Sequence, residues 1–367
     1  MFRKRTGTGL SAGTMELPFN FKTILILLHG SIGDVTRALP LASLIRQRFP
    51  QSVLAWAVEP AALPLVEHYR GLDEVIVFDR RRWWKSFGPF IRKIRSHRFD
   101  LVLDLQRHLK SGLISRWSGA PYRLGFHRSD CKEFNWVFNN HFIPPVGDQV
   151  PKIEHYMRFA EHLDITPQPI RWQMELTPQD TLRVKEYLQQ VTGDFAVLFV
   201  GARWESKQWF ASQIAACATE IQRRYGFSVV LLGSQADEGL ANEAEAAVVG
   251  RVHNWVGRTS LREAVGIISQ AKLCIGPDTG LMHLSAAVGT PVISLWGATN
   301  PMRTGPYGYD DLVVKGRADC SPCYRPSCPI GRVCMRSIAM EEILGMVPKA
   351  LARTQKMPVT DGNLHHI

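Results

Sequence analysis

The sequence lacks long apolar runs. No stretch of it approaches the roughly 18 uninterrupted apolar residues that cross a bilayer as a helix, which argues against a membrane-spanning protein. The apolar stretch at 24–28 is short and leads into His29 and a glycine turn instead of a small-residue cleavage site. We therefore interpret it as a buried strand and not as part of a signal peptide.

Two nucleotide-binding fingerprints are also missing. The turn at 30–33, Gly-Ser-Ile-Gly, lacks the third glycine of the dinucleotide motif, and no clear ribose-binding acid ends the second predicted strand. No Gly-Lys-Ser or Gly-Lys-Thr follows, which excludes a P-loop. We therefore expect the diphosphate of any nucleotide ligand to bind in the second half of the chain.

What the sequence does contain is a regular alternation of strand and helix patterns over 367 residues. This length favours two domains, and the alternation predicts an α/β fold of two Rossmann-like domains with parallel sheets facing a central cleft. A proline-rich segment between the halves is the predicted linker, and Thr177 followed by Pro178 predicts a helix start. The predicted parts are a flexible N-terminal extension (1–20), an N-terminal domain (21–165), the linker (166–180), a C-terminal domain (181–345) and a C-terminal tail (346–367).

Positive charge is concentrated in one segment. The formal net charge is +11, and residues 80–110 hold ten Lys and Arg against two acidic residues, with aromatic residues such as Trp83 and Trp84 between them. A basic and aromatic stretch favours an anionic partner, either an anionic lipid headgroup or nucleic acid. The alternative is a solvated basic helix face.

Three glycine turns lie between a predicted strand and a helix, at 29–35, 201–210 and 276–292. Such turns bind anions because free backbone N–H groups and the helix dipole point at the ligand. We expect Arg203 or Lys207 to meet a diphosphate from one side, and the backbone N–H groups of 279–281 to meet it from the other. The alternatives are that Lys207 is an ordinary surface lysine and that the last turn is plain capping, with Asp278 as N-cap and His283 packed.

Asp34 lies in the first turn. A carboxylate on an exposed turn at the cleft can take a proton from an attacking hydroxyl group. The alternative is that Asp34 only caps the helix that follows it.

Several segments together resemble the bacterial heptosyltransferases of lipopolysaccharide core synthesis, glycosyltransferase family 9. The resemblance runs from about 22 to 345 and is most specific in "GPDTGLMHLSAAVGTPVISLWGATNP" at 276–301. It implies a GT-B fold and an inverting, metal-independent transfer of heptose from ADP-heptose to the inner core of a lipid A-linked acceptor. The alternatives are a GT-B glycosyltransferase that uses another nucleotide sugar for a different surface glycan, and a sugar-nucleotide epimerase.

The resemblance also implies roles for single residues. Asp34 matches the catalytic base of the family, and Lys207 matches the lysine that neutralises the donor diphosphate. Two positions depart from the family pattern: Arg107 replaces a glycine that often follows the glutamine of "DLQ", and Arg203 replaces a small residue. The predicted donor-binding residues are Arg203, Lys207, Asp278, Thr279, Gly280, Leu281 and His283, and the predicted acceptor-binding residues are Ser31, Gly33, Gln106 and Arg107.

The same interpretation predicts partners and location. It predicts a nucleotide-sugar donor, an anionic glycolipid acceptor, no nucleic acid and no cofactor required for catalysis. It further predicts a cytoplasmic protein that associates peripherally with the inner face of the inner membrane through the basic and aromatic residues of 80–110.

Four cysteines cluster near the end of the chain with the spacing C-x2-C-x4-C-x5-C. Four thiolates within such a short segment are able to hold a structural zinc ion or an iron–sulfur cluster, although the paired C-x2-C motifs of zinc ribbons are absent. The alternatives are reduced thiols that pack a loop, or a disulfide, which a cytosolic location disfavours. The four are Cys320, Cys323, Cys328 and Cys334.

Overall fold

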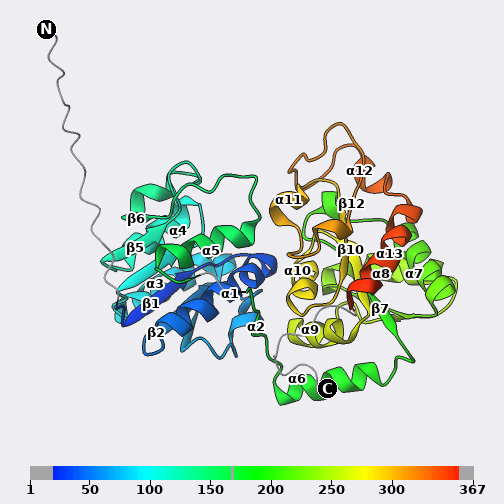
Figure 1. The fold of residues 1–367 in the computed structure, drawn as a ribbon, viewed down its shortest axis with the longest axis horizontal. Coiled ribbons are helices and arrows are strands. Elements are labelled where there is room, and N and C mark those ends of the chain that lie inside the picture. The colour runs from blue at the N-terminus through cyan, green and yellow to red at the C-terminus, as the bar shows by residue number, and fades with distance from the viewer. Residues whose placement is uncertain (1–19, 167–168, 355–367) are drawn as a thin grey trace, which may run out of the picture.

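The computed structural model describes residues 20–166 and 169–354, which form two similar halves side by side (Figure 1). Each half is built on a six-stranded sheet whose strand pairs are all parallel. The strands of the first half are β1 (Thr23–Leu27), β2 (Val53–Val58), β3 (Glu74–Val77), β4 (Leu101–Asp104), β5 (Tyr122–Gly125) and β6 (His141–Phe142). Those of the second half are β7 (Phe195–Phe199), β8 (Ser228–Leu232), β9 (Val252–Asn254), β10 (Leu273–Pro277), β11 (Val292–Trp296) and β12 (Val313–Lys315).

The two sheets have the same topology. Their strand orders are β3-β2-β1-β4-β5-β6 and β12-β11-β10-β7-β8-β9, so both read 3-2-1-4-5-6 when the strands are counted within each half. This is the doubly wound order of dinucleotide-binding folds, and it confirms the predicted pair of Rossmann-like domains. In such sheets ligands bind outside the carboxyl ends of the strands where the order reverses, which here means the loops after β1 and β4 and after β7 and β10.

Helices connect the strands. The helices of the first half are α1 (Ile32–Arg48), α2 (Leu63–Val66), α3 (Trp83–Ser96), α4 (Leu109–Trp117) and α5 (Lys152–His162). Those that follow are α6 (Pro178–Leu188), α7 (Ala211–Tyr225), α8 (Glu238–Ala247), α9 (Leu261–Gln270), α10 (Gly280–Ala287), α11 (Pro301–Thr304), α12 (Val333–Arg336) and α13 (Met340–Thr354). Short 3-10 turns include η1 (Arg80–Arg82), η2 (Asn135–Phe138) and η3 (Glu205–Lys207). Within 20–166 and 169–354, no helix combines the length and the apolar character that crossing a bilayer requires.

The central strands are buried along their length. In β1 every residue after Thr23 is buried, as expected for a parallel strand covered on both faces, and this confirms the interpretation of 24–28 as a buried strand. The predicted helix start at Thr177 is also confirmed, because its side chain accepts a hydrogen bond from the Asp180 backbone and Pro178 occupies the first helical position.

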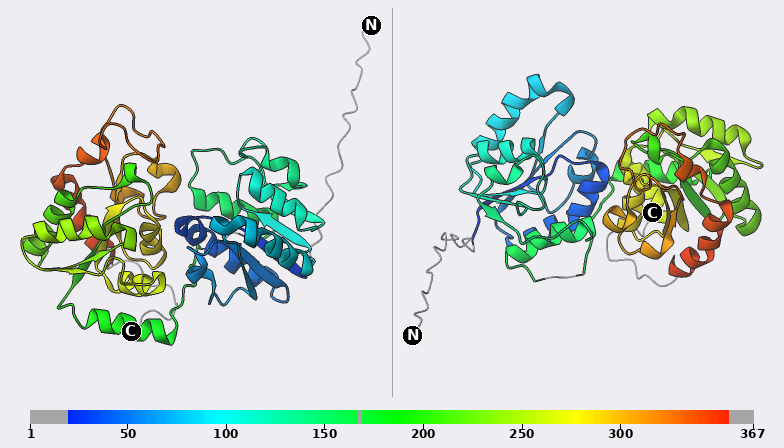
Figure 2. Two further views of the ribbon diagram at one scale, coloured as in Figure 1. Left: turned by 180° about the vertical axis from the view of Figure 1, so that it is seen from behind. Right: turned by 90° about the horizontal axis from the view of Figure 1, so that it is seen from above.

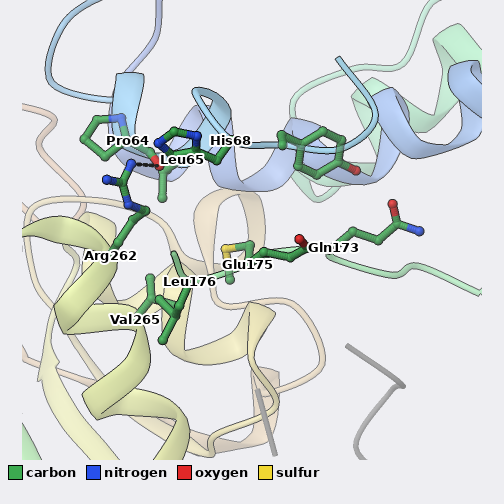
Figure 3. Close-up of a pocket in the computed structure, with 10 residues that line it drawn as sticks. Pro64, Leu65, His68, Gln173, Glu175, Leu176, Arg262 and Val265 are labelled. Atoms are coloured by element: carbon green, nitrogen blue, oxygen red, sulfur yellow. Dashed lines mark hydrogen bonds between the residues drawn. The ribbon is translucent and has the colours of Figure 1, made fainter. Parts of the chain in front are cut away.

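The two halves are in contact through α1 and α10, which lie next to each other in all the views (Figures 1 and 2). Leu284 and Ala287 of α10 are buried in the hydrophobic core of the first half. A second contact joins α2, the segment 173–176 and α9, where Arg262 reaches the carbonyl of Pro64 (Figure 3). None of the predicted site residues lines the small pocket at this second contact.

The ends of the chain and the connection between the halves complete the fold. Residues 169–177 form neither helix nor strand, and residues 1–19 of the predicted extension (1–20) lie outside the described residues. The predicted tail begins at 346, within α13, where Val347 and Ala350 are buried; residues 355–367 lie outside the described part.

Candidate functional site

Asp34 is the third residue of α1. The helix begins at Ile32, and Ser31 is its N-cap, because the Ser31 hydroxyl accepts a hydrogen bond from the Asp34 backbone at 3.4 Å. The same hydroxyl donates to Asp34 Oδ2 at 3.2 Å. The alternative in which Asp34 is only the helix cap is therefore wrong, since Ser31 has that position.

Two cations hold the other oxygen of Asp34. Arg37 Nη2 lies 2.6 Å and Lys152 Nζ lies 2.5 Å from Asp34 Oδ1, and the Asp34 side chain is 20% exposed. Burial by itself raises the pKa of Asp34, but the charges of Lys152 and Arg37 outweigh it and hold the pKa far below its usual value. Asp34 is thus ionised at neutral pH, and it is a weak base for as long as both cations stay bound.

Arg37 also joins the two halves. Its Nη1 lies 2.5 Å from Nε2 of His283, which belongs to α10 in the second half. Burial and the charge of Arg37 lower the pKa of His283 well below its usual value, so the ring is neutral and accepts the hydrogen bond. The predicted first-half residue Asp34 and second-half residue His283 are in this way connected through one guanidinium group.

Glycines allow this close approach. A Cβ atom on Gly33 would lie 2.5 Å from Cδ2 of His283, and one on Gly280 would lie 2.8 Å from Cβ of Ile32. The first turns of α1 and α10 therefore touch backbone to side chain. A larger residue at Gly33 would have to displace the His283 ring, and one at Gly280 would clash with Cβ of Ile32.

The loop after β7 carries the predicted donor-side lysine. Lys207 lies in η3, and its Nζ is 2.6 Å from Asp278 Oδ2 and 4.5 Å from the centre of the Trp204 ring. The Thr299 hydroxyl donates to the same Asp278 oxygen at 2.7 Å. With a side chain only 17% exposed, Lys207 is not an ordinary surface lysine.

The loop after β10 leads into α10. Its N-cap is Thr279 and not Asp278, so the plain-capping alternative is wrong for Asp278, whose carboxylate is bound to Lys207 instead. Gly280 is the first residue of α10, and Leu281 is half-buried. Arg203 is exposed. Burial raises the pKa of Glu59 in the first half, and the charges of Arg80 and Arg203 oppose this increase.

The loop after β4 holds the predicted acceptor-side residues. Gln106 is half-buried, and its backbone N–H donates to Asp104 Oδ1 at 3.1 Å. Arg107 is buried, its guanidinium lies 4.7 Å from the centre of the Phe126 ring, and it donates to Nδ1 of His155. The four loops of the two switch points, together with the first turns of the helices that follow β1 and β10, thus contain every predicted donor and acceptor residue, whose roles remain predictions.

Sequence analysis missed five residues at this site. They lie in α1, near the start of α5, and in α11, and no local motif marks those on α5 or α11. Arg37 had a usable signal, because it follows Asp34 by three residues and so lies on the same side of a helix. The five are Arg37, Lys152, His155, Tyr156 and Arg303.

The structure does not support the metal interpretation of the cysteine cluster. Among the residues that the structure describes, no group of three or more His, Cys, Asp or Glu side chains is arranged to hold a metal ion. Cys320 is exposed, Cys323 and Cys328 are half-buried, and Cys334 is buried, all as free thiols. Burial raises the pKa of Cys334, and the nearby thiols of the other three raise it further.

Comparison with known proteins gives the family. A family model described as glycosyltransferase family 9 (heptosyltransferase) matches residues 88–333. The chain belongs to glycosyltransferase family 9. The chain is therefore a glycosyltransferase, and the resemblance seen in the sequence is confirmed.

Curated relatives of this family 9 glycosyltransferase cover nearly its whole length. The lipopolysaccharide core heptosyltransferase OpsX of Haemophilus influenzae is 25% identical over 342 residues, which is 89% of this chain and 96% of the relative. Lipopolysaccharide heptosyltransferase 1 of Pseudomonas aeruginosa is 28% identical over 317 residues, which is 83% of this chain and 87% of the relative.

Solved structures agree on the fold. A family 9 glycosyltransferase of Veillonella parvula has a TM-score of 0.77 at 19% identity, over 92% of this chain and 99% of that chain. ADP-heptose lipopolysaccharide heptosyltransferase II of E. coli has a TM-score of 0.71 at 22% identity, over 91% and 99%. The family 9 glycosyltransferase described here has the same GT-B fold.

Proposed function

We propose that this family 9 glycosyltransferase transfers heptose from ADP-heptose to the inner core of a lipid A-linked lipopolysaccharide acceptor. One observation carries the proposal: Asp34 and Lys207 follow strands at the switch points of opposite sheets, and Arg37 and His283 link their surroundings across the interface. A base on one half and a diphosphate site on the other is the arrangement that glycosyl transfer needs. The names of the curated relatives support the choice of sugar and acceptor.

The proposed reaction is a single displacement. Asp34 accepts the proton of an acceptor hydroxyl, and the oxygen attacks the anomeric carbon from the face opposite the diphosphate. The C–O bond to the diphosphate breaks as the new bond forms, so the configuration inverts. Lys207 and the N–H groups at the start of α10 stabilise the negative charge that develops on the leaving ADP.

We further propose that the transfer needs no metal ion. Lys207 is a partly buried cation whose Nζ lies 2.6 Å from Asp278 Oδ2. A diphosphate is able to bind this cation by replacing the Asp278 carboxylate. A positive side chain together with a helix N-terminus supplies the charge that a divalent metal supplies to other phosphate sites.

Replacing Asp34 tests the mechanism. We expect Asp34→Asn to lower kcat by about 10²- to 10⁴-fold, because Asn cannot accept the proton, while thermal stabilisation by ADP is retained. Lys207→Ala should instead lose most of the stabilisation by ADP. Arg158→Ala, on the exposed side of α5, is the matched control and should match the wild type. Unchanged turnover of Asp34→Asn would remove Asp34 from the mechanism.

The donor is tested separately. A panel of ADP- and UDP-sugars is compared by thermal shift, because a ligand that binds only the native state must stabilise it. Stabilisation by ADP-heptose supports the proposed donor. A shift with a UDP-sugar and none with ADP-heptose would favour the alternative of another nucleotide sugar and another surface glycan.

We also propose that the protein works in the cytoplasm at the inner face of the inner membrane, bound through α3 and its neighbours. Trp83 and Trp84 are 60% and 65% exposed, and the basic side chains of η1 precede them directly. Trp117 of α4 is 43% exposed and its ring contacts Phe87 of α3, which extends the aromatic surface. Exposed tryptophans beside basic residues suit the headgroup region of an anionic membrane.

A further inference from the structure

Two arginines from opposite halves share one weakly held carboxylate. Arg107 follows β4, Arg303 belongs to α11, and both approach the same oxygen, Oδ1 of Asp148. The distances are 3.4 Å from Arg107 Nη1 and 3.6 Å from Arg303 Nη2, which is long for charge-assisted contacts. The Asp148 side chain is 73% exposed, so this carboxylate is free to leave.

Arg107 is built into this position. It is buried, it stacks on Phe126, and it donates to Nδ1 of His155. His155 is fully buried and its Nε2 donates to the Val150 carbonyl at 3.2 Å, which leaves Nδ1 as the acceptor. Burial and the charge of Arg107 lower the pKa of His155 to about 4, so this neutral ring orients the guanidinium without cancelling its charge.

The surroundings carry an excess of positive charge. Four cationic side chains lie near three carboxylates, an excess of one positive charge, and the neutral rings of His155 and His283 add none. Burial lowers the pKa of Arg107, and the nearby charge of Arg303 lowers it further, which is the expected sign of two cations held close together. The charged groups are Arg37, Arg107, Lys152, Arg303, Asp34, Asp130 and Asp148.

Buried polar atoms here also lack partners. The Tyr156 hydroxyl is fully buried and has no hydrogen-bond partner in the described structure, and neither does Nε of Arg303. Leaving such groups unsatisfied is costly, so they favour an oxygen-rich ligand. The first turns of α5 carry Lys152, His155 and Tyr156. One helix therefore supplies the cation that binds Asp34, the ring that accepts the hydrogen bond of Arg107, and the unpaired hydroxyl.

We propose that Arg107, Arg303 and Lys152 form a binding site for an anionic group of the acceptor, a phosphate or a carboxylate, and that Asp148 occupies its place until the acceptor binds. The inference rests on the proposed function, which supplies the acceptor. The anion displaces the Asp148 carboxylate, bridges the two guanidinium groups and so joins the two halves beside Asp34. Because it needs residues of both halves, the site forms only when they are close together.

The first experiment uses inorganic phosphate as the probe and needs no turnover. Thermal stabilisation by phosphate is measured against sodium chloride of equal ionic strength. We expect Arg303→Ala to lose most of the stabilisation and Asp148→Asn to increase it, because the competing carboxylate is gone. The proposal would be overturned if phosphate stabilised Arg303→Ala as much as the wild type and only Lys207→Ala lost the stabilisation.

The second experiment uses the acceptor. We expect Arg303→Ala and Arg107→Ala to raise the KM for a phosphorylated lipid A core acceptor by about ten- to a hundredfold, with the KM for the donor unchanged. The increase should disappear on an acceptor whose phosphates are removed or whose carboxylates are esterified, which also tells the two anion sources apart. An equal loss on every acceptor would mean a merely structural role and would overturn the site.

The two experiments separate this inference from the proposed function. Wild-type protein that transfers no heptose to any lipid A core acceptor contradicts the proposed function, yet the phosphate response of Asp148→Asn still tests the anion site. Arg303→Lys keeps a cation with a different shape, and it should retain part of the phosphate response.

Discussion

Asp34 combines two properties that oppose each other. It is the proposed base, and two cations bind its Oδ1, Arg37 at 2.6 Å and Lys152 at 2.5 Å. A carboxylate that is stabilised so strongly accepts a proton poorly. For Asp34 to act, at least one cation has to turn to another anion, and Lys152 is the more exposed of the two, at 25% against 8% for Arg37.

Lys152→Met tests this relation. Removing one cation raises the pKa of Asp34, so the ionised base is lost at a higher pH, and we expect the acid limb of the kcat/KM profile to move to higher pH. Lys152→Arg keeps a cation and should keep the wild-type profile. A uniform fall in rate with an unmoved acid limb would contradict the prediction. The measurement is kcat/KM over a series of pH values.

Asp104 is a second buried carboxylate, and its role is structural. Burial raises its pKa to about 6, although hydrogen bonds from Asn135, Asn139 and Ser111 act in the opposite direction. It accepts the backbone N–H of Gln106 and the Asn135 amide at 3.1 and 2.8 Å, so it shapes the loop that carries Arg107.

Asp104 predicts a pH dependence of stability. Its pKa is higher in the folded state, about 6, than the ordinary 3.8, so the folded state binds the proton more tightly. The contribution of Asp104 to the free energy of unfolding is therefore fully present below about pH 4. It is lost as the pH rises through about 6, and the total loss is about 3 kcal/mol. We expect urea unfolding of Asp104→Asn to lack this component. A constant difference in free energy of unfolding between the two proteins over this range would contradict the prediction.

At the scale of elements, the first turns of α1 and α10 decide how the halves meet. Gly33 lies against His283 and Gly280 lies against Ile32, and both contacts exist only because the glycines have no side chain. A glycine in a first helical turn is usually explained by local backbone needs, but here the neighbouring domain imposes the requirement.

Gly280→Ala tests this requirement. Its Cβ would lie 2.8 Å from Cβ of Ile32, so the halves must move apart, and we expect kcat/KM to fall by about a hundredfold. The melting temperature should change little, because Ala favours a helix over Gly. Gly239→Ala on α8 is the matched control, since nothing lies within 4 Å of its added Cβ. Equal kinetics of the two variants would contradict the prediction.

At the scale of the whole molecule, the net charge of +11 is unevenly placed. At the domain interface the cations near Asp34 and Asp278 are paired with these carboxylates, whereas Arg80, Arg81 and Arg82 of η1 are all exposed. Charge on the outside of the first half is therefore available to a membrane surface, while charge at the interface is available to substrates.

Liposome binding tests the outer surface. We expect the double variant Trp83→Ala and Trp84→Ala to bind vesicles that contain anionic phospholipid on the order of tenfold more weakly than the wild type, because the apolar area that enters the headgroup region is lost. Leu182→Ala is the control, since Leu182 is 63% exposed on the distant α6. Equal binding of the double variant and the control would contradict membrane association through α3.

Sequence analysis predicted the fold and the loops of the site because their signals are local. A buried strand followed by a glycine and a helix is recognisable within a dozen residues, and in parallel sheets such turns meet at one edge. This was enough to propose Asp34, Lys207 and the turn at 278–283 as site residues, and their assigned roles came from the family resemblance. The described residues give no support to the metal interpretation of the cysteines, because spacing along the chain does not by itself arrange the side chains as metal ligands.

The sequence by itself determined the two Rossmann-like domains and the loops that carry the proposed chemistry, because strand, glycine and helix follow one another in the chain. The family followed from the resemblance of its motifs, most specifically at 276–301. Only the tertiary structure decided which groups surround Asp34. Lys152 is 118 positions away from it, and Arg37 meets His283 across 246 positions. Such pairs depend on how α1, α5 and α10 pack together, and packing depends on the shape of the whole molecule and not on any short pattern.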